Sequence, residues 1–301
     1  MTKTQGSKNA PPDGGRDPRP LQIQAHFDAY LPHCRRISLG ELPVSADLYE
    51  HNMNSPCIVF IPGIGTYSEY YCEYLFKLSL CGFNVLGIDP RGHGYSGGAR
   101  GYYRIDEVVA DFQLALDYLS EHYNGRIGVI GSSIGARLGL GLAEADHRVR
   151  SLLCHTLFLS EFPPDIWHQI GWQSVAFTAF WVPDFRIDLH SFIDIEDLMN
   201  EFPLGRYAMT DERMVWSYPV STLKGLYSTP SKVVKQSLHI PACVLIGGED
   251  KVIRPDYVRD LTAYTAQKFD VNEIPGAGHM LPLADSDRMA DETRAWFDRT
   301  L

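Results

Sequence analysis

No long apolar run occurs in the 301-residue sequence, and the closest approach, residues 166–182, is interrupted by Gln169 and Gln173. A membrane-spanning helix needs about 20 consecutive apolar residues, so none is expected. Residues 1–20 also lack the apolar centre of a signal peptide. They are polar and rich in proline and glycine, and we expect a disordered tail there.

Positive charge and cysteine are both in short supply. Lys and Arg number 27 against 37 Asp and Glu, and this net charge of −10, without a basic stripe, argues against a nucleic-acid partner. The six cysteines show neither C-x-x-C nor zinc-like spacing, so a cysteine-based metal site is not expected. Scattered cysteines favour a reducing cytoplasm, and no metal or other cofactor is implied.

Short apolar runs alternate with amphipathic segments through most of the chain, as in Cys57–Ile61 followed by residues 68–80. Apolar runs without alternation are typical of strands covered on both faces. The pattern predicts an α/β fold with a mostly parallel, doubly wound sheet. Strands are expected at 36–39, 44–49, 57–61, 83–88, 127–130, 149–154, 243–246 and 269–274, and helices at 68–80, 106–122, 136–145 and 289–301.

This alternation breaks between about residues 155 and 239. The interval holds four of the five tryptophans and shows no strand–helix rhythm. We expect a helical cap at 156–238, inserted between the two parts of the core, 21–155 and 239–301. Simple packing of a second domain, without substrate contact, explains the same residues equally well.

The most informative motif is the G-x-S-x-G formed by Gly131, Ser133 and Gly135. It follows an apolar strand and precedes a run of helix formers, which is the context of a nucleophile elbow. A second G-x-S-x-G, with Ser96 at its centre, lies several residues past a strand and leads into a loop. Ser133 is therefore the expected nucleophile.

A serine nucleophile needs a neutral imidazole, and that imidazole needs an acceptor. The order Ser, Asp, His places the acid after a later strand and the base after the last one. Residues 244–250 form an apolar run that ends in Glu249 and Asp250, and a glycine-rich loop places His279 after the last strand. The shorter side chain and the G-x-x-D spacing favour Asp250 as the acid.

Backbone N–H groups are the usual donors to a tetrahedral oxyanion. Ile134, the residue after the expected nucleophile, supplies one such group. The loop Pro62–Thr66 follows an early strand, and its glycines allow a second N–H, that of Ile64, to turn inward. A nucleotide cradle is the alternative for this loop, but no complete phosphate-binding motif is present.

Together these motifs resemble the α/β-hydrolase superfamily, and within it the monoacylglycerol lipase and lysophospholipase-like group that includes serine aminopeptidase S33-type sequences. The resemblance covers residues 56–285, including the stretch Asp89–Gly97. It implies a Ser133–Asp250–His279 triad, oxyanion donors at Ile64 and Ile134, and an inserted cap. Pro62 departs from the pattern, because relatives often carry His there.

The expected function is a serine esterase that cleaves a carboxylic ester of an apolar acyl or alkyl group through an acyl-enzyme. A thioesterase, a lactonase or a C–C bond hydrolase would present the same triad, and a non-catalytic ligand-binding protein is the rival from another class. In the cap, Asp165 is expected to begin an aromatic helix, from which Trp172 and Phe177 would contact the small-molecule substrate.

Overall fold

The computed structural model describes residues 21–191 and 193–301, and the tail expected at 1–20 lies outside them. Its centre is an eight-stranded sheet in the order β1-β2-β4-β3-β5-β6-β9-β10. Only β2 runs against its neighbours, and every other pair is parallel, so the expected mostly parallel sheet is confirmed. The strands are Arg35–Leu39, Val44–Tyr49, Cys57–Ile61, Asn84–Ile88, Ile127–Ser132, Val149–His155, Ala242–Gly247 and Asp270–Ile274.

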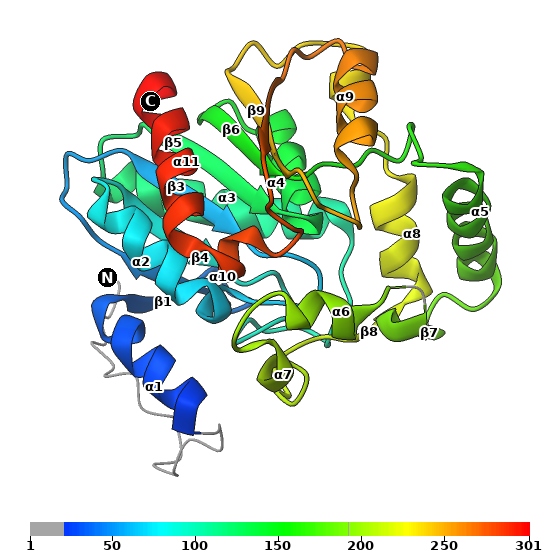
Figure 1. Cartoon of the computed structure of the whole chain (residues 1–301), viewed down its shortest axis with the longest axis horizontal. Helices are drawn as coiled ribbons and strands as arrows, with labels where there is room; N and C mark the ends of the chain where they lie inside the picture. The colour runs from blue at the N-terminus through cyan, green and yellow to red at the C-terminus, as the bar shows by residue number, and fades with distance from the viewer. Residues whose placement is uncertain (1–20, 192) are drawn as a thin grey trace.

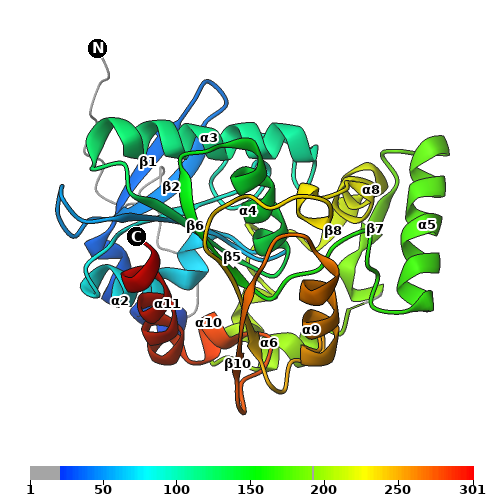
Figure 2. The same ribbon diagram turned by 90° about the horizontal axis from the view of Figure 1, so that it is seen from above.

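Helices cover both faces of this sheet, as Figures 1 and 2 show, with α3 and α4 on one side and α2 and α11 on the other. Every residue of β3, β4 and β5 is buried between these layers, which explains why their sequences are continuous apolar runs. The helices of the core are Leu21–Tyr30 (α1), Cys72–Leu80 (α2), Ile105–His122 (α3), Ile134–Ala145 (α4), Pro255–Tyr264 (α9), Leu281–Ala284 (α10) and Ser286–Thr300 (α11).

The inserted segment is the stretch between β6, which ends at His155, and β9, which begins at Ala242, and it contains the residues for which a cap is predicted. Figures 1 and 2 both place its helix α5 (Ile166–Trp181) at the outer end of the molecule, beyond α8 (Val220–Ser228). Asp165 begins α5 and accepts a hydrogen bond from the His168 amide, as expected of a helix cap. The other elements are β7 (Arg186–Asp188), α6 (Ile195–Asn200), α7 (Gly205–Ala208) and β8 (Ser217–Pro219).

The elements differ from the expected ones at a few places. Helices α1 and α9 were not expected from the sequence; each is short and buries a single stripe, such as Ile23 and Phe27 of α1. The helix expected at 68–80 begins with a tighter 3-10 turn, Ser68–Tyr71. Within the described part of the chain, no helix is long and apolar enough to cross a membrane.

Candidate active site

The turn from β5 into α4 brings Ser133 to the carboxyl edge of the sheet. Its backbone has φ 54° and ψ −119°, a strained conformation for a residue with a side chain. The flanking glycines make the turn possible. A Cβ at Gly131 would lie 2.1 Å from the carbonyl oxygen of Gly135, and a Cβ at Gly135 would lie 2.2 Å from that of Ile61. This geometry is that of the expected nucleophile elbow.

The Ser133 backbone is fixed while its hydroxyl is free. Its amide donates to the carbonyl oxygen of His155, at the end of β6, over 2.8 Å. Among the described residues, nothing hydrogen-bonds the half-buried hydroxyl. Ser96 is the opposite case, because its hydroxyl accepts from the Ser45 amide at 2.8 Å and donates to the Asp89 carbonyl at 2.7 Å. Ser96 therefore holds a loop together.

His279 and Asp250 are brought together from the loops after β10 and β9. The Nδ1 atom of His279 lies 2.7 Å from Oδ2 of Asp250, and both side chains are buried. The other carboxylate oxygen accepts from the Val252 and Ile253 amides at 2.8 and 2.9 Å. Because a carboxylate only accepts, Nδ1 of His279 carries a proton, and in the neutral imidazole Nε2 keeps a lone pair. The neighbouring Glu249 is exposed.

His155 lies between His279 and the turn at Ser133. Its Nδ1 atom lies 3.1 Å from the Ser132 hydroxyl, and its ring centroid lies 6.3 Å from that of His279. Burial, with a smaller contribution from the neighbouring His279, lowers the pKa of His155 to about 3. His155 is therefore neutral at physiological pH, and its buried Nε2 atom has no hydrogen-bond partner among the described residues.

The loop after β3 presents one free amide between two restrained glycines. The Gly63 amide donates to the Tyr71 hydroxyl at 3.4 Å, and the Gly63 carbonyl accepts from the Thr66 hydroxyl at 2.9 Å. Both backbone groups of Gly65 are also hydrogen-bonded. Within the described chain, the Ile64 amide between them has no partner. Ile134 is the first residue of α4, where helical amides lack intrahelical acceptors.

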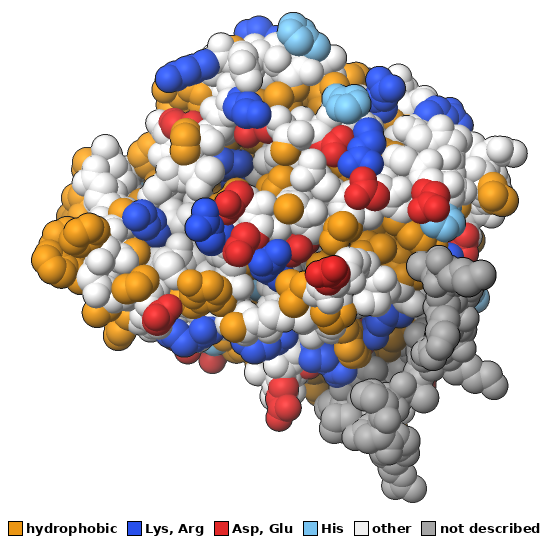
Figure 3. Space-filling model, turned by 180° about the vertical axis from the view of Figure 1, so that it is seen from behind, with side chains coloured by type: hydrophobic (Ala, Val, Ile, Leu, Met, Phe, Trp, Pro, Cys, Tyr) orange, Lys and Arg blue, Asp and Glu red, His pale blue; other side chains and the backbone are white. Residues whose placement is uncertain are grey.

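Trp172 and Phe177, the two expected substrate contacts, lie in different surroundings. Trp172 is half-buried and stacks on Tyr227 with 5.2 Å between ring centroids, and it lies 6.0 Å from Phe158, just past the end of β6. Phe177 is 69% exposed. It belongs to the outer face of α5, whose apolar side chains gather at one end of the molecule (Figure 3).

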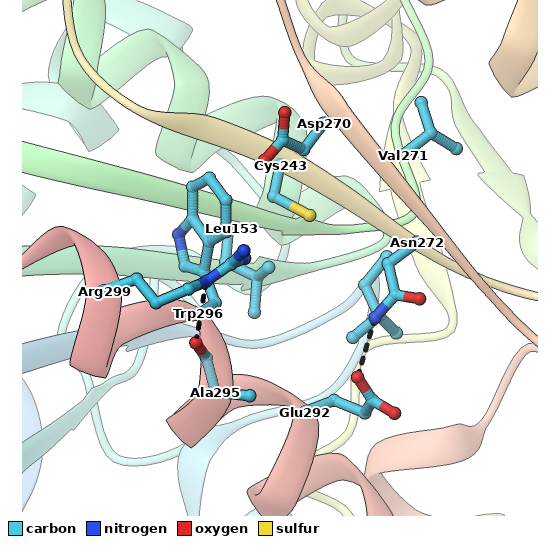
Figure 4. A pocket seen from close by; sticks show the side chains of 10 residues that line it. Leu153, Cys243, Asp270, Val271, Asn272, Glu292, Ala295, Trp296 and Arg299 are labelled. Atoms are coloured by element: carbon cyan, nitrogen blue, oxygen red, sulfur yellow. Dashed lines mark hydrogen bonds between the residues drawn. The ribbon is translucent and has the colours of Figure 1, made fainter.

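A groove of about 570 Å³ lies elsewhere, beside α11 and the amino-terminal halves of β9 and β10 (Figure 4). Cys243, Asn272 and Trp296 line it, and Asn272 is hydrogen-bonded to Glu292. Open α/β sheets bind ligands at the carboxyl ends of their strands, so we place the active site at the elbow. Among the described residues, no three His, Cys, Asp or Glu side chains are grouped to hold a metal ion.

Two side chains of the inserted segment hydrogen-bond to loops of the site, and neither was predicted from the sequence. The Glu201 carboxylate accepts from the Met280 amide at 2.9 Å, next to His279. The Tyr218 hydroxyl accepts from the Gly65 amide at 2.8 Å. Each contact joins residues far apart in the chain, so no local pattern could reveal it. The stretch Asp89–Gly97, whose His93 is hydrogen-bonded to Tyr218, was the nearest part of the sequence motifs to these contacts.

The chain is similar to known proteins over most of its length. The family model described as serine aminopeptidase, S33, matches residues 54–287, well over half of the chain. DcsB in complex with its substrate analogue has a TM-score of 0.70 at 16% identity, covering 89% of this chain and 100% of that one. A soluble variant of the Saccharomyces cerevisiae monoglyceride lipase, in complex with a substrate analogue, has a TM-score of 0.69 at 16% identity. The match covers 89% of this chain and 95% of that one. The Paleococcus ferrophilus monoacylglycerol lipase has a TM-score of 0.63 at 17% identity, and the match covers 84% of this chain and 98% of that one.

The sheet order, with these superpositions, shows the α/β-hydrolase fold. Within that class the chain belongs to the serine aminopeptidase S33 family. At such low identities the superpositions establish the fold, and the family match establishes a hydrolase. Bond type and substrate come from the site itself.

Replacing Ser133 by Ala should reduce kcat for any hydrolysed substrate by at least about 10⁴-fold, because the other hydroxyl at the elbow, that of Ser132, is hydrogen-bonded to His155. Ser96→Ala is the matched control and should stay within about tenfold of wild type, since it alters only loop hydrogen bonds. Steady-state kinetics on both variants measures this. Loss of activity in Ser96→Ala alone would contradict the assignment of the elbow.

Asp250→Asn should lower kcat by about 10²–10⁴-fold, because an amide can donate to Nδ1 and so favour the wrong imidazole tautomer. Glu249→Gln changes an exposed neighbour and should leave kcat within about threefold. The kcat of each variant is compared with that of wild type at saturating substrate, and circular dichroism checks that each variant is folded. A larger effect in Glu249→Gln would mean that the other carboxylate is the acid.

Proposed function

We propose that this protein hydrolyses carboxylic esters with an apolar acyl or alkyl group, through an acyl-enzyme on Ser133. The observation that carries the proposal is the His279–Asp250 hydrogen bond together with a strained serine whose hydroxyl is free. His155 lies between them, because its carbonyl accepts from the Ser133 amide and its ring centroid lies 6.3 Å from that of His279. A buried, oriented imidazole at the end of the last strand is what a serine nucleophile requires. The free Ile64 amide supplies the remaining part, a donor for negative charge.

Acylation would begin when Nε2 of His279 removes the Ser133 proton as the serine oxygen attacks the ester carbonyl. Asp250 keeps the Nδ1 proton in place and stabilises the imidazolium that forms. The carbonyl oxygen becomes an oxyanion, which the Ile64 and Ile134 amides stabilise at the amino terminus of α4. The imidazolium then protonates the departing alcohol, leaving the acyl group on Ser133.

Deacylation would repeat these steps with water. Neutral His279 takes a proton from water, the resulting hydroxide attacks the acyl carbonyl, and the same two amides hold the second oxyanion. The tetrahedral intermediate collapses as the imidazolium returns a proton to the Ser133 oxygen, and the carboxylic acid leaves. No cofactor enters this sequence, and the six free cysteines are compatible with a reducing cytoplasm.

An aromatic cluster supports the apolar substrate class. Phe158, Trp172 and Tyr227 lie within about 6 Å of one another, and Phe158 follows His155 by only three residues. This cluster therefore extends from the end of β6, beside the elbow, into the inserted segment. We propose that its surface receives the acyl chain, with Trp172 as the main contact.

The reaction class is tested with a panel of p-nitrophenyl esters, thioesters and lactones, run on wild type and Ser133→Ala. Ester turnover that Ser133→Ala abolishes is the expected result. A fluorophosphonate probe, which reacts with activated serines, should label wild type at Ser133. Absence of both labelling and turnover would favour a non-catalytic ligand-binding protein and would overturn the proposal.

Chain length tests the acyl site. Each CH₂ buried against the cluster should add about 0.8 kcal/mol, or about fourfold in binding, so kcat/KM should rise from acetyl to about C8 esters. Trp172→Ala should flatten this rise. Phe177→Ala, at the more exposed of the two expected contacts, should flatten it less. Phe180→Ala removes another exposed aromatic ring from the same helix and is the matched control, which should keep the slope. A profile that falls steadily from acetyl upward would refute an apolar acyl site.

A further inference from the structure

The loop that carries the Ile64 amide is held by the inserted segment. Gly65 donates its amide proton to the Tyr218 hydroxyl at 2.8 Å, and its carbonyl oxygen accepts from the Val215 amide at 2.9 Å. Gly65 has φ +75°, and a Cβ there would lie 2.6 Å from the Val215 carbonyl oxygen. The segment around β8 and this loop therefore meet backbone to backbone, immediately next to the proposed oxyanion donor.

His93 holds Tyr218 from the other side. Its Nε2 atom lies 2.5 Å from the Tyr218 hydroxyl oxygen, and its Nδ1 atom lies 3.1 Å from the carbonyl oxygen of Arg91. His93 belongs to the stretch Asp89–Gly97 that marks the family resemblance, and nothing in the hydrolytic steps above uses it. Tyr218 belongs to the inserted segment, 125 residues further along the chain.

The donor directions in this chain of hydrogen bonds are fixed by chemistry. The Arg91 carbonyl can only accept, so His93 carries its proton on Nδ1, and its Nε2 accepts. The Gly65 amide can only donate, so the Tyr218 oxygen accepts from it and donates its own proton to His93. Burial lowers the pKa of His93 to about 4 and raises that of Tyr218 well above its usual value, so both groups stay neutral.

We propose that Tyr218 and His93 are positioning residues for the oxyanion hole, acting through Gly65 on the Ile64 amide. The inference rests on the proposed acyl-enzyme function. Loss of the Tyr218 hydroxyl leaves a buried amide on Gly65 without an acceptor, and the loop must shift to satisfy it. The Ile64 amide, one residue away, then no longer points at the position where negative charge develops.

The effect should appear in kcat. Removing an oxyanion-hole donor outright costs about 10²–10³-fold in kcat, and displacing it should cost less. We therefore expect Tyr218→Phe and His93→Leu each to lower kcat by about 10- to 100-fold and to leave KM within about threefold of wild type. His93→Gln restores an acceptor toward Tyr218 and should recover part of the loss. The double variant Tyr218→Phe, His93→Leu should be no worse than either single variant, because the two residues form one chain.

Inhibitors separate positioning from general damage to the fold. The Ser133 hydroxyl adds to the carbonyl of an alkyl trifluoromethyl ketone, and the adduct carries an oxyanion. The carboxylic acid product forms no such adduct. In Tyr218→Phe, the inhibition constant of the ketone should rise by the same factor as kcat falls, while that of the acid stays unchanged. Tyr74→Phe is the matched control, since Tyr74 is a buried tyrosine bonded to Thr293 at 2.9 Å between α2 and α11, and it should keep wild-type kcat.

A kcat for Tyr218→Phe within twofold of that for Tyr74→Phe would overturn the inference, as would a ketone inhibition constant that does not change. These outcomes are distinct from failure of the proposed function, which would show as wild-type turnover in Ser133→Ala. Turnover that depends on Ser133 but not on Tyr218 would leave the serine mechanism intact and remove only the positioning role.

Discussion

The site depends on how closely three stretches of backbone approach one another at the elbow. A methyl group on Gly131 would collide with the start of α4, and one on Gly135 would collide with the end of β3. The two glycines therefore allow these backbones to approach each other. That contact sets the proposed oxyanion loop, which continues from β3, against the serine that precedes α4. The strain at Ser133 is maintained because β5, the buried end of β6 (Ser151–His155) and the buried start of α4 (Ile134–Leu140) hold the turn from three sides.

The two loops that flank the elbow, after β3 and after β10, are each held by a side chain of the inserted segment. Tyr218 contacts the loop of Ile64, and Glu201 contacts the loop of His279. A Cβ at Gly278 would lie 2.4 Å from the Glu201 carboxylate, so this approach also leaves no room for a side chain. The inserted segment thus helps to shape the site on both sides of Ser133, in addition to any contact with substrate.

Much of this could be predicted from the sequence, because the strands and the elbow are local. Apolar runs such as Cys57–Ile61 marked the strands to within about two residues. Chain order selected His279 and the loop of the acid, and side-chain length with the G-x-x-D spacing favoured Asp250, which the structure joins to His279 by a hydrogen bond. The contacts of Tyr218 and Glu201 could not be predicted, since they join residues more than 70 positions apart. The outward face of α5 was equally hidden, because a helix that is apolar on most sides gives no signal of which side is covered.

The arrangement also constrains how such a protein can change. Trp172, which we propose contacts the acyl chain, and Tyr218, which holds the oxyanion loop, lie in the same inserted segment. The packing of α5 on α8, continuous with β8, connects them mechanically. A substitution that widens the acyl site by shifting α8 also moves Tyr218, and with it the Gly65 amide. New substrates are therefore most easily accommodated by side-chain changes that leave the backbone from Val215 to Val220 in place, whereas replacement of the whole segment must restore an acceptor for Gly65 to keep turnover.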